Sequence, residues 1–194
     1  MLKNEFNVKG YFYNYSGQFC RKYLTIIKKN KEGIPQDLNV IMMNPGSAKP
    51  EGTLLNNTKD DVATTPDRTQ YRIMRLMLDL NFNHAKIINL SDYVEKVSED
   101  FYKKIKSNSN DWHSIFFDSR KKDLDKHLLQ NIPTLLAWGV DERLNELTEK
   151  AWKHLGSKNY KTFGYCKEVD SNQYYHPLLR KGNWLEEVKK TYKK

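Results

Sequence analysis

The chain has few of the features that stabilise small secreted proteins or direct a chain to a membrane. Of its 194 residues only two are cysteines, Cys20 and Cys166, and neither lies in a Cys-x-x-Cys or His-x-x-x-His pattern. This spacing argues against a disulfide framework and a zinc site, and it favours reduced thiols. No window approaches the roughly 18 consecutive apolar residues of a membrane span, and the first residues lack the apolar core of a secretory signal. We therefore expect a cytoplasmic protein without membrane segment, metal or cofactor.

The sequence also lacks a glycine-rich phosphate loop of the P-loop or dinucleotide kind, and it has no internal repeat. Its 38% hydrophobic and 12% aromatic residues are enough to argue against a disordered chain. A chain of 194 residues can bury a sizeable core without metals or disulfides. We expect one domain over residues 1–194, and a monomer.

Positive charge is what the chain has in excess. It carries 33 Lys and Arg against 24 Asp and Glu, a net charge of +9. Such a balance favours a polyanionic partner such as nucleic acid, because contacts with phosphates release counterions. The alternative is that the lysines only keep the protein soluble. Arg68, Arg72 and Arg75 are spaced so that a helix would bring them near one another.

Short apolar runs that end in turn-forming residues predict buried strands. These runs lie at 38–43, 85–90, 134–138 and 160–165. Helical spacing predicts helices from the N-cap Asp67 to about 81, over 111–130 and 141–155, and from about 183. This alternation predicts a three-layer α/β/α fold with a central, mainly parallel, four-stranded sheet. Residues 6–28 read as a strand pair, although 19–29 could equally form a helix, and 47–66 read as a long polar loop.

Polar residues follow several of the predicted strands. Asn44 comes after the first strand, with Pro45 and Gly46 behind it; Asn89 ends the second; and His176 follows the last. The carboxyl ends of parallel strands are where open α/β sheets hold ligands, so we expect these side chains around one cleft. The plainer readings are a strand-ending turn, a turn cap and a surface histidine.

Four motifs occur in the order, and at roughly the spacing, seen in the uracil-DNA glycosylase superfamily. They are Asn44-Pro45-Gly46, Ile88-Asn89-Leu90, Leu136-Ala137-Trp138-Gly139 and His176-Pro177-Leu178. The chain resembles a distant branch of that superfamily over about Leu38 to Leu179, in short islands. It also resembles an uncharacterised bacterial family with an Asn-Pro-Ser-x-Ala turn, an Asp-x-Thr-x-Arg-like segment and a terminal His-Pro-Leu.

The resemblance implies a monofunctional DNA glycosylase that flips uracil out of single- or double-stranded DNA and hydrolyses its N-glycosidic bond. Asn44 would orient the attacking water, and His176 would donate a hydrogen bond to the uracil O2 as negative charge builds there. Asn89 would match the O4 and N3–H edge of uracil. Gly46 falls where some branches place a tyrosine that excludes the thymine methyl, so related lesions could also be accepted.

Other residues take supporting roles by the same resemblance. Met43, Pro45 and Gly46 would shape the base pocket, and Tyr71, Tyr93 or Tyr174 would stack on the base. Leu178 or Leu179 would fill the vacated base stack, with at least one of the two packing on the core. The residues expected to contact DNA phosphates are Arg68, Arg72, Arg180 and Lys181.

The sequence leaves two alternatives to this function. One is a catalytically inactive nucleic-acid-binding module of the same fold, and the other is a hydrolase or transferase of free nucleosides. Tight, salt-dependent binding without strand scission would distinguish the first of these from an enzyme.

Overall fold

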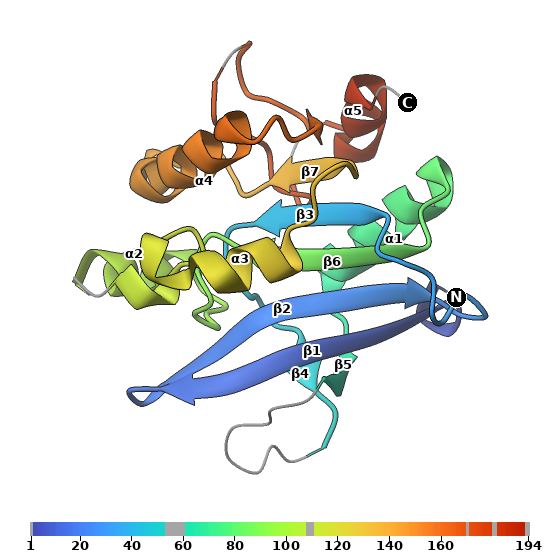
Figure 1. Ribbon diagram of the computed structural model, residues 1–194, viewed down its shortest axis with the longest axis horizontal. Coiled ribbons are helices and arrows are strands. Elements are labelled where there is room, and N and C mark those ends of the chain that lie inside the picture. Colours follow the sequence, from blue (N-terminus) through green and yellow to red (C-terminus); the bar gives the residue numbers. More distant parts are fainter. Residues whose placement is uncertain (1, 53–60, 108–110, 170, 180–181, 193–194) are drawn as a thin grey trace.

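A computed structural model describes residues 2–52, 61–107, 111–169, 171–179 and 182–192. These residues form a sheet of eight strands in the order β4-β5-β1-β2-β6-β3-β7-β8 (Figure 1). The strands are β1 (Phe6–Tyr15), β2 (Gln18–Lys28), β3 (Leu38–Met42), β4 (Lys49–Pro50), β5 (Val62–Thr65), β6 (His84–Asn89), β7 (Thr134–Ala137) and β8 (Thr162–Phe163). The α-helices are α1 (Arg68–Leu80), α2 (Ser98–Ser107), α3 (Lys121–His127), α4 (Asn145–Ser157) and α5 (Trp184–Thr191).

The prediction of a mainly parallel, four-stranded sheet is wrong. The four predicted strands do pair in parallel, as β6-β3-β7-β8, but they make up only half of the sheet. The pairs β4–β5, β5–β1, β1–β2 and β2–β6 are antiparallel. Strand β2 covers the edge that β6 would otherwise expose, with Leu24 opposite Ile87, and unpaired strand edges are rarely left open in folded proteins.

Several local predictions hold and others need correction. Residues 6–28 do form a strand pair, β1 and β2. Strands β4 and β5 lie within 47–66, where one long loop was expected, and 53–60 fall outside the described residues. The helix expected over 111–130 is two short 3-10 turns followed by α3, whereas α2 lies in a segment with no predicted helix.

Helix α1 begins and ends as the sequence indicated. The side chain of Asp67 accepts hydrogen bonds from the backbone N–H groups of Thr69 and Gln70, and the Gln70 side chain accepts one from the Asp67 N–H. This reciprocal capping satisfies backbone donors that have no partner within the helix. The helix ends at Asn81, which is left-handed with φ 60°, a conformation that asparagine tolerates.

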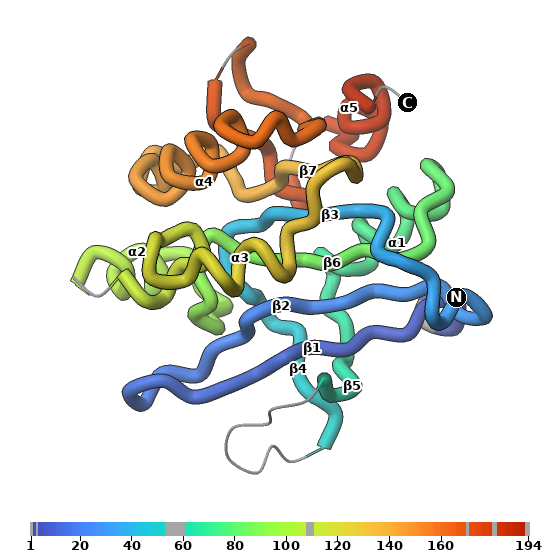
Figure 2. Tube along the Cα trace, in the orientation of Figure 1, coloured from blue at the N-terminus to red at the C-terminus, as the bar shows by residue number. Residues whose placement is uncertain are grey.

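Helices cover both faces of the sheet. Side chains of α1 and α5 share a buried cluster with one face, and side chains of α3 and α4 share another with the opposite face. Figure 2 shows α2, α3 and α4 passing on the near side while α1 lies behind the strands. Within the described residues, no helix combines the length and apolar character that crossing a membrane needs.

A bulge in β2 fixes the direction of two neighbouring cations. Tyr11 pairs with Tyr23 but Phe12 pairs with Arg21, so Lys22 is the extra residue. Such an insertion breaks the strict alternation of a strand. As a result the Lys22 Nζ lies 3.1 Å from a carboxylate oxygen of Asp123 in α3. Arg21 instead lines a pocket together with residues at the start of α1. The bulge therefore sends one cation to each side of the sheet.

Candidate active site

A pocket of about 320 Å³ opens between the loop after β3, the start of α1, the segment after β6 and the loop that follows β8. Its volume falls at the lower end of the roughly 300–1,000 Å³ found for small-molecule sites. Two of the side chains expected to meet in a cleft, Asn44 and His176, are more than a hundred residues apart in sequence and both line it. The other expected site residues that line it are Met43, Gly46, Arg68 and Leu178.

The carboxamide of Asn44 is fixed by its surroundings. Its Nδ2 donates to the backbone carbonyl of Glu95 at 2.7 Å and to that of Tyr93 at 3.3 Å. The loop is tied to the same segment by the Glu95 N–H, which donates to the Pro45 carbonyl at 3.2 Å. Because the nitrogen is held by carbonyls, the amide oxygen is the atom that Asn44 offers to a ligand, and it can only accept.

His176 is held as a neutral donor. Its Nδ1 accepts a hydrogen bond from the Leu178 backbone N–H at 3.2 Å, which places the ring proton on Nε2. Burial lowers the pKa of His176 to about 4, although the negative charge of Asp67 acts to raise it. At neutral pH the ring therefore carries no charge, and its Nε2–H is available for a substrate oxygen.

Asp67 joins the turn after β3 to α1. Besides capping the helix, its Oδ2 accepts from the Ser47 backbone N–H at 2.9 Å and from the Ser47 hydroxyl at 3.3 Å. A Cβ built on Gly46 would lie 3.0 Å from that same Oδ2. A side chain at position 46 would therefore push against the cap, which explains the glycine without reference to a substrate.

Asn89 lies at the base of this region rather than on the pocket wall. It is 0% exposed, and neither its Oδ1 nor its Nδ2 has a hydrogen-bond partner within the described part of the chain. In the β3–β6 register it pairs with Met42, which lines the pocket. Buried carboxamides are almost always satisfied, so an unpartnered donor and acceptor beside a cavity point to a ligand or to water.

Arg21 is the residue of this site that sequence reasoning missed. It lines the pocket, is only 1% exposed, and its Nε and Nη1 have no partner among the described residues. Burial lowers the pKa of Arg21 to about 10, opposed by the charges of Asp67 and Asp92, so the guanidinium stays protonated at neutral pH. The available signal was an arginine between the aromatic residues Phe19 and Tyr23 of β2, next to Lys22.

Four other charged side chains line the pocket, those of Asp67, Arg68, Glu95 and Lys96. The carboxylates of Asp67 and Glu95 already accept hydrogen bonds, the latter from the Lys96 N–H at 3.0 Å and the Lys104 Nζ at 3.4 Å. Lys96 lies at the exposed rim, where no lysine was expected. No group of three or more His, Cys, Asp or Glu in the described ranges could hold a metal ion.

The three candidate stacking aromatics lie outside the pocket. Tyr93 is buried in another cluster, where it stacks on His113 with ring centroids 4.9 Å apart. Tyr71 lines a shallow depression next to the pocket, together with Arg68. Tyr174 is buried in the cluster on the opposite face of the sheet, edge-on to Trp138. None of the three rings is among the pocket-lining residues, so the structure brings no predicted aromatic side chain onto its wall.

Of the expected DNA-binding residues that the structure describes, Arg68 and Leu178 line the pocket and the others do not. Leu178 is 38% exposed and lines the pocket, whereas Leu179 packs against the cluster that includes Trp184 of α5. Arg72 is exposed on α1 and does not line the pocket. Arg180 and Lys181 lie outside the described residues.

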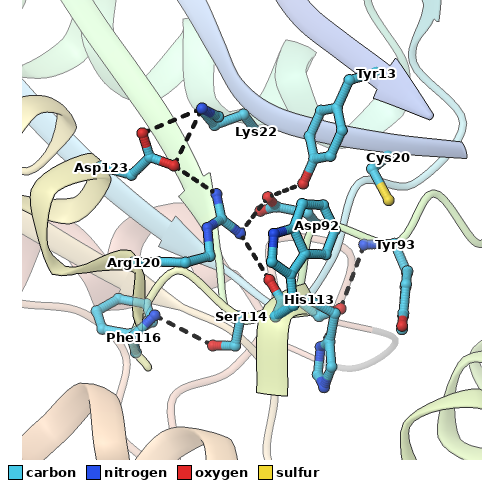
Figure 3. A network of polar contacts seen from close by, with 12 residues as sticks. Tyr13, Cys20, Lys22, Asp92, Tyr93, His113, Ser114, Phe116, Arg120 and Asp123 are labelled. Atoms are coloured by element: carbon cyan, nitrogen blue, oxygen red, sulfur yellow. Dashed lines mark hydrogen bonds and ion pairs between the residues drawn. The ribbon is translucent and has the colours of Figure 1, made fainter. Parts of the chain in front are cut away.

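A second polar centre lies on the opposite side of the sheet (Figure 3). Asp92 is 0% exposed, and its Oδ2 accepts from Arg120 Nη1 and from the Tyr13 hydroxyl, each at 2.6 Å. Arg120 also contacts Asp123 at 3.3 Å, and Lys22 completes the network. Burial raises the pKa of Asp92 to about 6, against the charge of Arg120, so the carboxylate is ionised at neutral pH.

Residues 24–178, well over half of the chain, match the family described as protein of unknown function (DUF1643). The chain belongs to that family. It matches no curated protein and no solved structure. The DUF1643 match includes Asn44, Asn89 and His176 but begins after Arg21.

Proposed function

We propose that this DUF1643 protein is a DNA glycosylase that flips uracil into the pocket and hydrolyses its N-glycosidic bond. The observation that carries the proposal is the meeting of Asn44 and His176 on one pocket, with the unpartnered carboxamide of Asn89 beside it. Each of the three offers the hydrogen-bonding group that the reaction requires, and a flipped base is read in this way by enzymes that act on DNA bases.

The chain's own residues divide the work of the reaction. Asn89 presents one donor and one acceptor, which match the O4 and N3–H edge of uracil and oppose the edge of cytosine. His176 offers its Nε2–H to a carbonyl oxygen of the base as the bond to C1′ breaks. The oxygen of Asn44 orients the water that adds to C1′. An amide hardly accepts a proton, and the nearby carboxylates are engaged, so we expect slow chemistry.

DNA is the proposed partner, and the net charge of +9 supports it. We further propose a monomeric, cytoplasmic protein that works without metal or cofactor. We propose no lyase step, although Lys96 at the rim could in principle form an imine with the abasic sugar. Borohydride trapping of a covalent protein–DNA adduct would overturn that part.

The test uses end-labelled oligonucleotides with one uracil, followed by alkaline cleavage of abasic sites. We expect scission by the wild type and a loss of at least about 100-fold in Asn44→Ala, the lower end of what a positioned catalytic group contributes. Asn7→Ala is the control, because Asn7 is an asparagine of β1 outside the pocket. Full activity in Asn44→Ala, with both variants folded, would contradict the proposal.

The alternative is an inactive nucleic-acid-binding module, which the basic composition also fits. Binding that weakens steeply with salt, without scission on any uracil substrate, would favour the module. Release of the base from free deoxyuridine but not from DNA would instead indicate a nucleoside hydrolase.

A further inference from the structure

Arg21 is a buried cation whose Nε and Nη1 have no hydrogen-bond partner in the part of the chain that the structure describes. Its backbone N–H donates to the Asp92 carbonyl at 2.9 Å, which fixes the position of the residue in β2. The side chain is then directed to the pocket, 1% exposed, with Nε and Nη1 unpartnered within the described residues. Burying an ion without a charge partner or hydrogen bonds costs several kcal/mol.

Of the two carboxylates that act on Arg21 at a distance, Asp67 is occupied by hydrogen bonds, whereas Asp92 is occupied at one oxygen only, since its Oδ1 has no partner within the described residues. The Asp67 carboxylate accepts hydrogen bonds from Ser47 and from the first turn of α1. The Oδ2 of Asp92 accepts hydrogen bonds from Tyr13 and Arg120 on the other side of the sheet. Neither carboxylate hydrogen-bonds to the Arg21 guanidinium, so its donors are left for something that enters the pocket.

Asn89 lies on the neighbouring strand, at the same end of the sheet as Arg21. Strand β2 pairs with β6 through Leu24 and Ile87. Because the two strands are antiparallel, Arg21, which precedes Leu24, and Asn89, which comes after Ile87, both lie beyond this pair at the same end of the sheet. A cation on the pocket wall therefore lies on the strand next to one that carries an unpartnered amide donor and acceptor behind that wall. A heterocycle whose ring amide is read by Asn89 and whose carbonyl oxygens gain negative charge would satisfy both groups at once.

We propose that Arg21 is the receptor for the negative charge of the departing base, and that the site is selective for bases that leave as anions. This inference rests on the proposed function. In the step, the C1′–N1 bond breaks and its electron pair stays on the base, where it spreads over O2 and O4. Water adds to C1′ and gives its proton to solvent, and the base later takes a proton from solvent. Arg21 joins His176 in stabilising the base, while Asn44 acts at the sugar.

The test compares two leaving bases of nearly equal size in single-turnover cleavage. The 5-fluorouracil anion is intrinsically more stable than the uracil anion, so it needs less help from a cation. We expect Arg21→Gln to slow uracil release by about 100- to 1,000-fold, as removal of a preorganised charge-stabilising donor does, and to slow 5-fluorouracil release clearly less. Oligonucleotide affinity should stay unchanged, and Arg21→Lys should recover part of the rate.

Arg75→Gln is the matched control, because Arg75 is exposed on α1 and pairs with Asp79 away from the pocket. It should leave both rates unchanged. An equal loss for the two bases in Arg21→Gln would overturn the inference, since a merely structural role for Arg21 does not distinguish leaving groups. The proposed function would survive that result.

A binding experiment separates failure of the inference from failure of the function. Free 5-fluorouracil is titrated by calorimetry as the pH is raised and the base becomes an anion. Affinity should rise with pH in the wild type and not in Arg21→Gln. If affinity rises with pH only in the wild type but no DNA is cleaved, the role of Arg21 as an anion receptor stands and the proposed glycosylase activity is wrong. No binding by the wild type, or the same pH dependence in both proteins, would overturn the inference.

Discussion

Two arginines are buried at one end of the sheet, and their surroundings differ. Arg120, 5% exposed, hydrogen-bonds to Asp92, Asp123 and the Trp112 carbonyl. Arg21, 1% exposed, has no side-chain partner for its Nε and Nη1 among the described residues. Asp92 touches both, with its side chain on Arg120 and its backbone carbonyl on Arg21. The difference indicates that Arg120 serves the fold, whereas Arg21 serves whatever occupies the pocket.

The largest effect should come from removing the paired arginine. Arg120→Gln leaves the buried carboxylate of Asp92 without its cation, and breaking a buried pair in this way costs about 3–5 kcal/mol. Urea denaturation would measure the loss. Arg143→Gln is the control, because its pairs with Glu99 and Asp141 are surface pairs, with the Arg143 side chain 48% exposed, and solvent screening leaves such pairs little effect on stability. Equal losses in both variants would remove the distinction between the two kinds of pair.

A pH effect of intermediate size should come from the same side of the sheet. Burial lowers the pKa of His113 from 6.5 to about 4, and its carbonyl accepts from the Asp92 N–H. Below pH 6.5 the unfolded chain binds a proton that the folded protein excludes. Stability is therefore lost as the pH falls from 6.5 to about 4, by up to about 3 kcal/mol.

Urea midpoints of the wild type and of His113→Gln across that range would measure the contribution. His127 and His176, with pKa values also lowered to about 4 by burial, add to the slope, and Asp92 opposes it. His113→Gln should therefore reduce the slope without abolishing it. An unchanged slope would show that His113 takes up a proton freely in the folded protein.

The smallest effect should come from the unpaired arginine, and with the opposite sign. Arg21→Met removes a buried charge whose Nε and Nη1 have no partner within the described ranges, so the free energy of unfolding should rise by about 1 kcal/mol or more. Residues that serve a site are commonly unfavourable for stability in this way. A loss of stability as large as that of Arg120→Gln would show that Arg21 is part of the fold after all.

The parallel half of the sheet could be predicted from sequence because its strands lie in short, mainly apolar runs, of which β3 and β7 are buried throughout. Strand β3, for example, is buried at every position from Leu38 to Met42. The antiparallel half could not be placed, since alternation along β1 and β2 predicts strands but not their partners. Helix α1 was predictable because Asp67 and Gln70 form a local capping box, a signal that needs no tertiary contact.

The site was predictable only in part. Asn44 and His176 follow strands and turns that the sequence marks, so the sheet topology brings them together. Arg21 could not be found in this way, because counting alternate residues back from Leu24 gives Lys22 as the inward residue. The stacking aromatic could not be predicted for a related reason. Tyr93 is held away from the pocket wall by packing on His113, and no local sequence pattern reports such a contact.

The extra residue in β2 separates the fates of its two cations. Lys22 has no partner of its own in the β1–β2 register, so its removal would leave Arg21 opposite Phe12 and facing the pocket. Asp123 would lose its lysine in the same step. A single-codon deletion at this point of the gene should therefore alter one surface of the hairpin and spare the other.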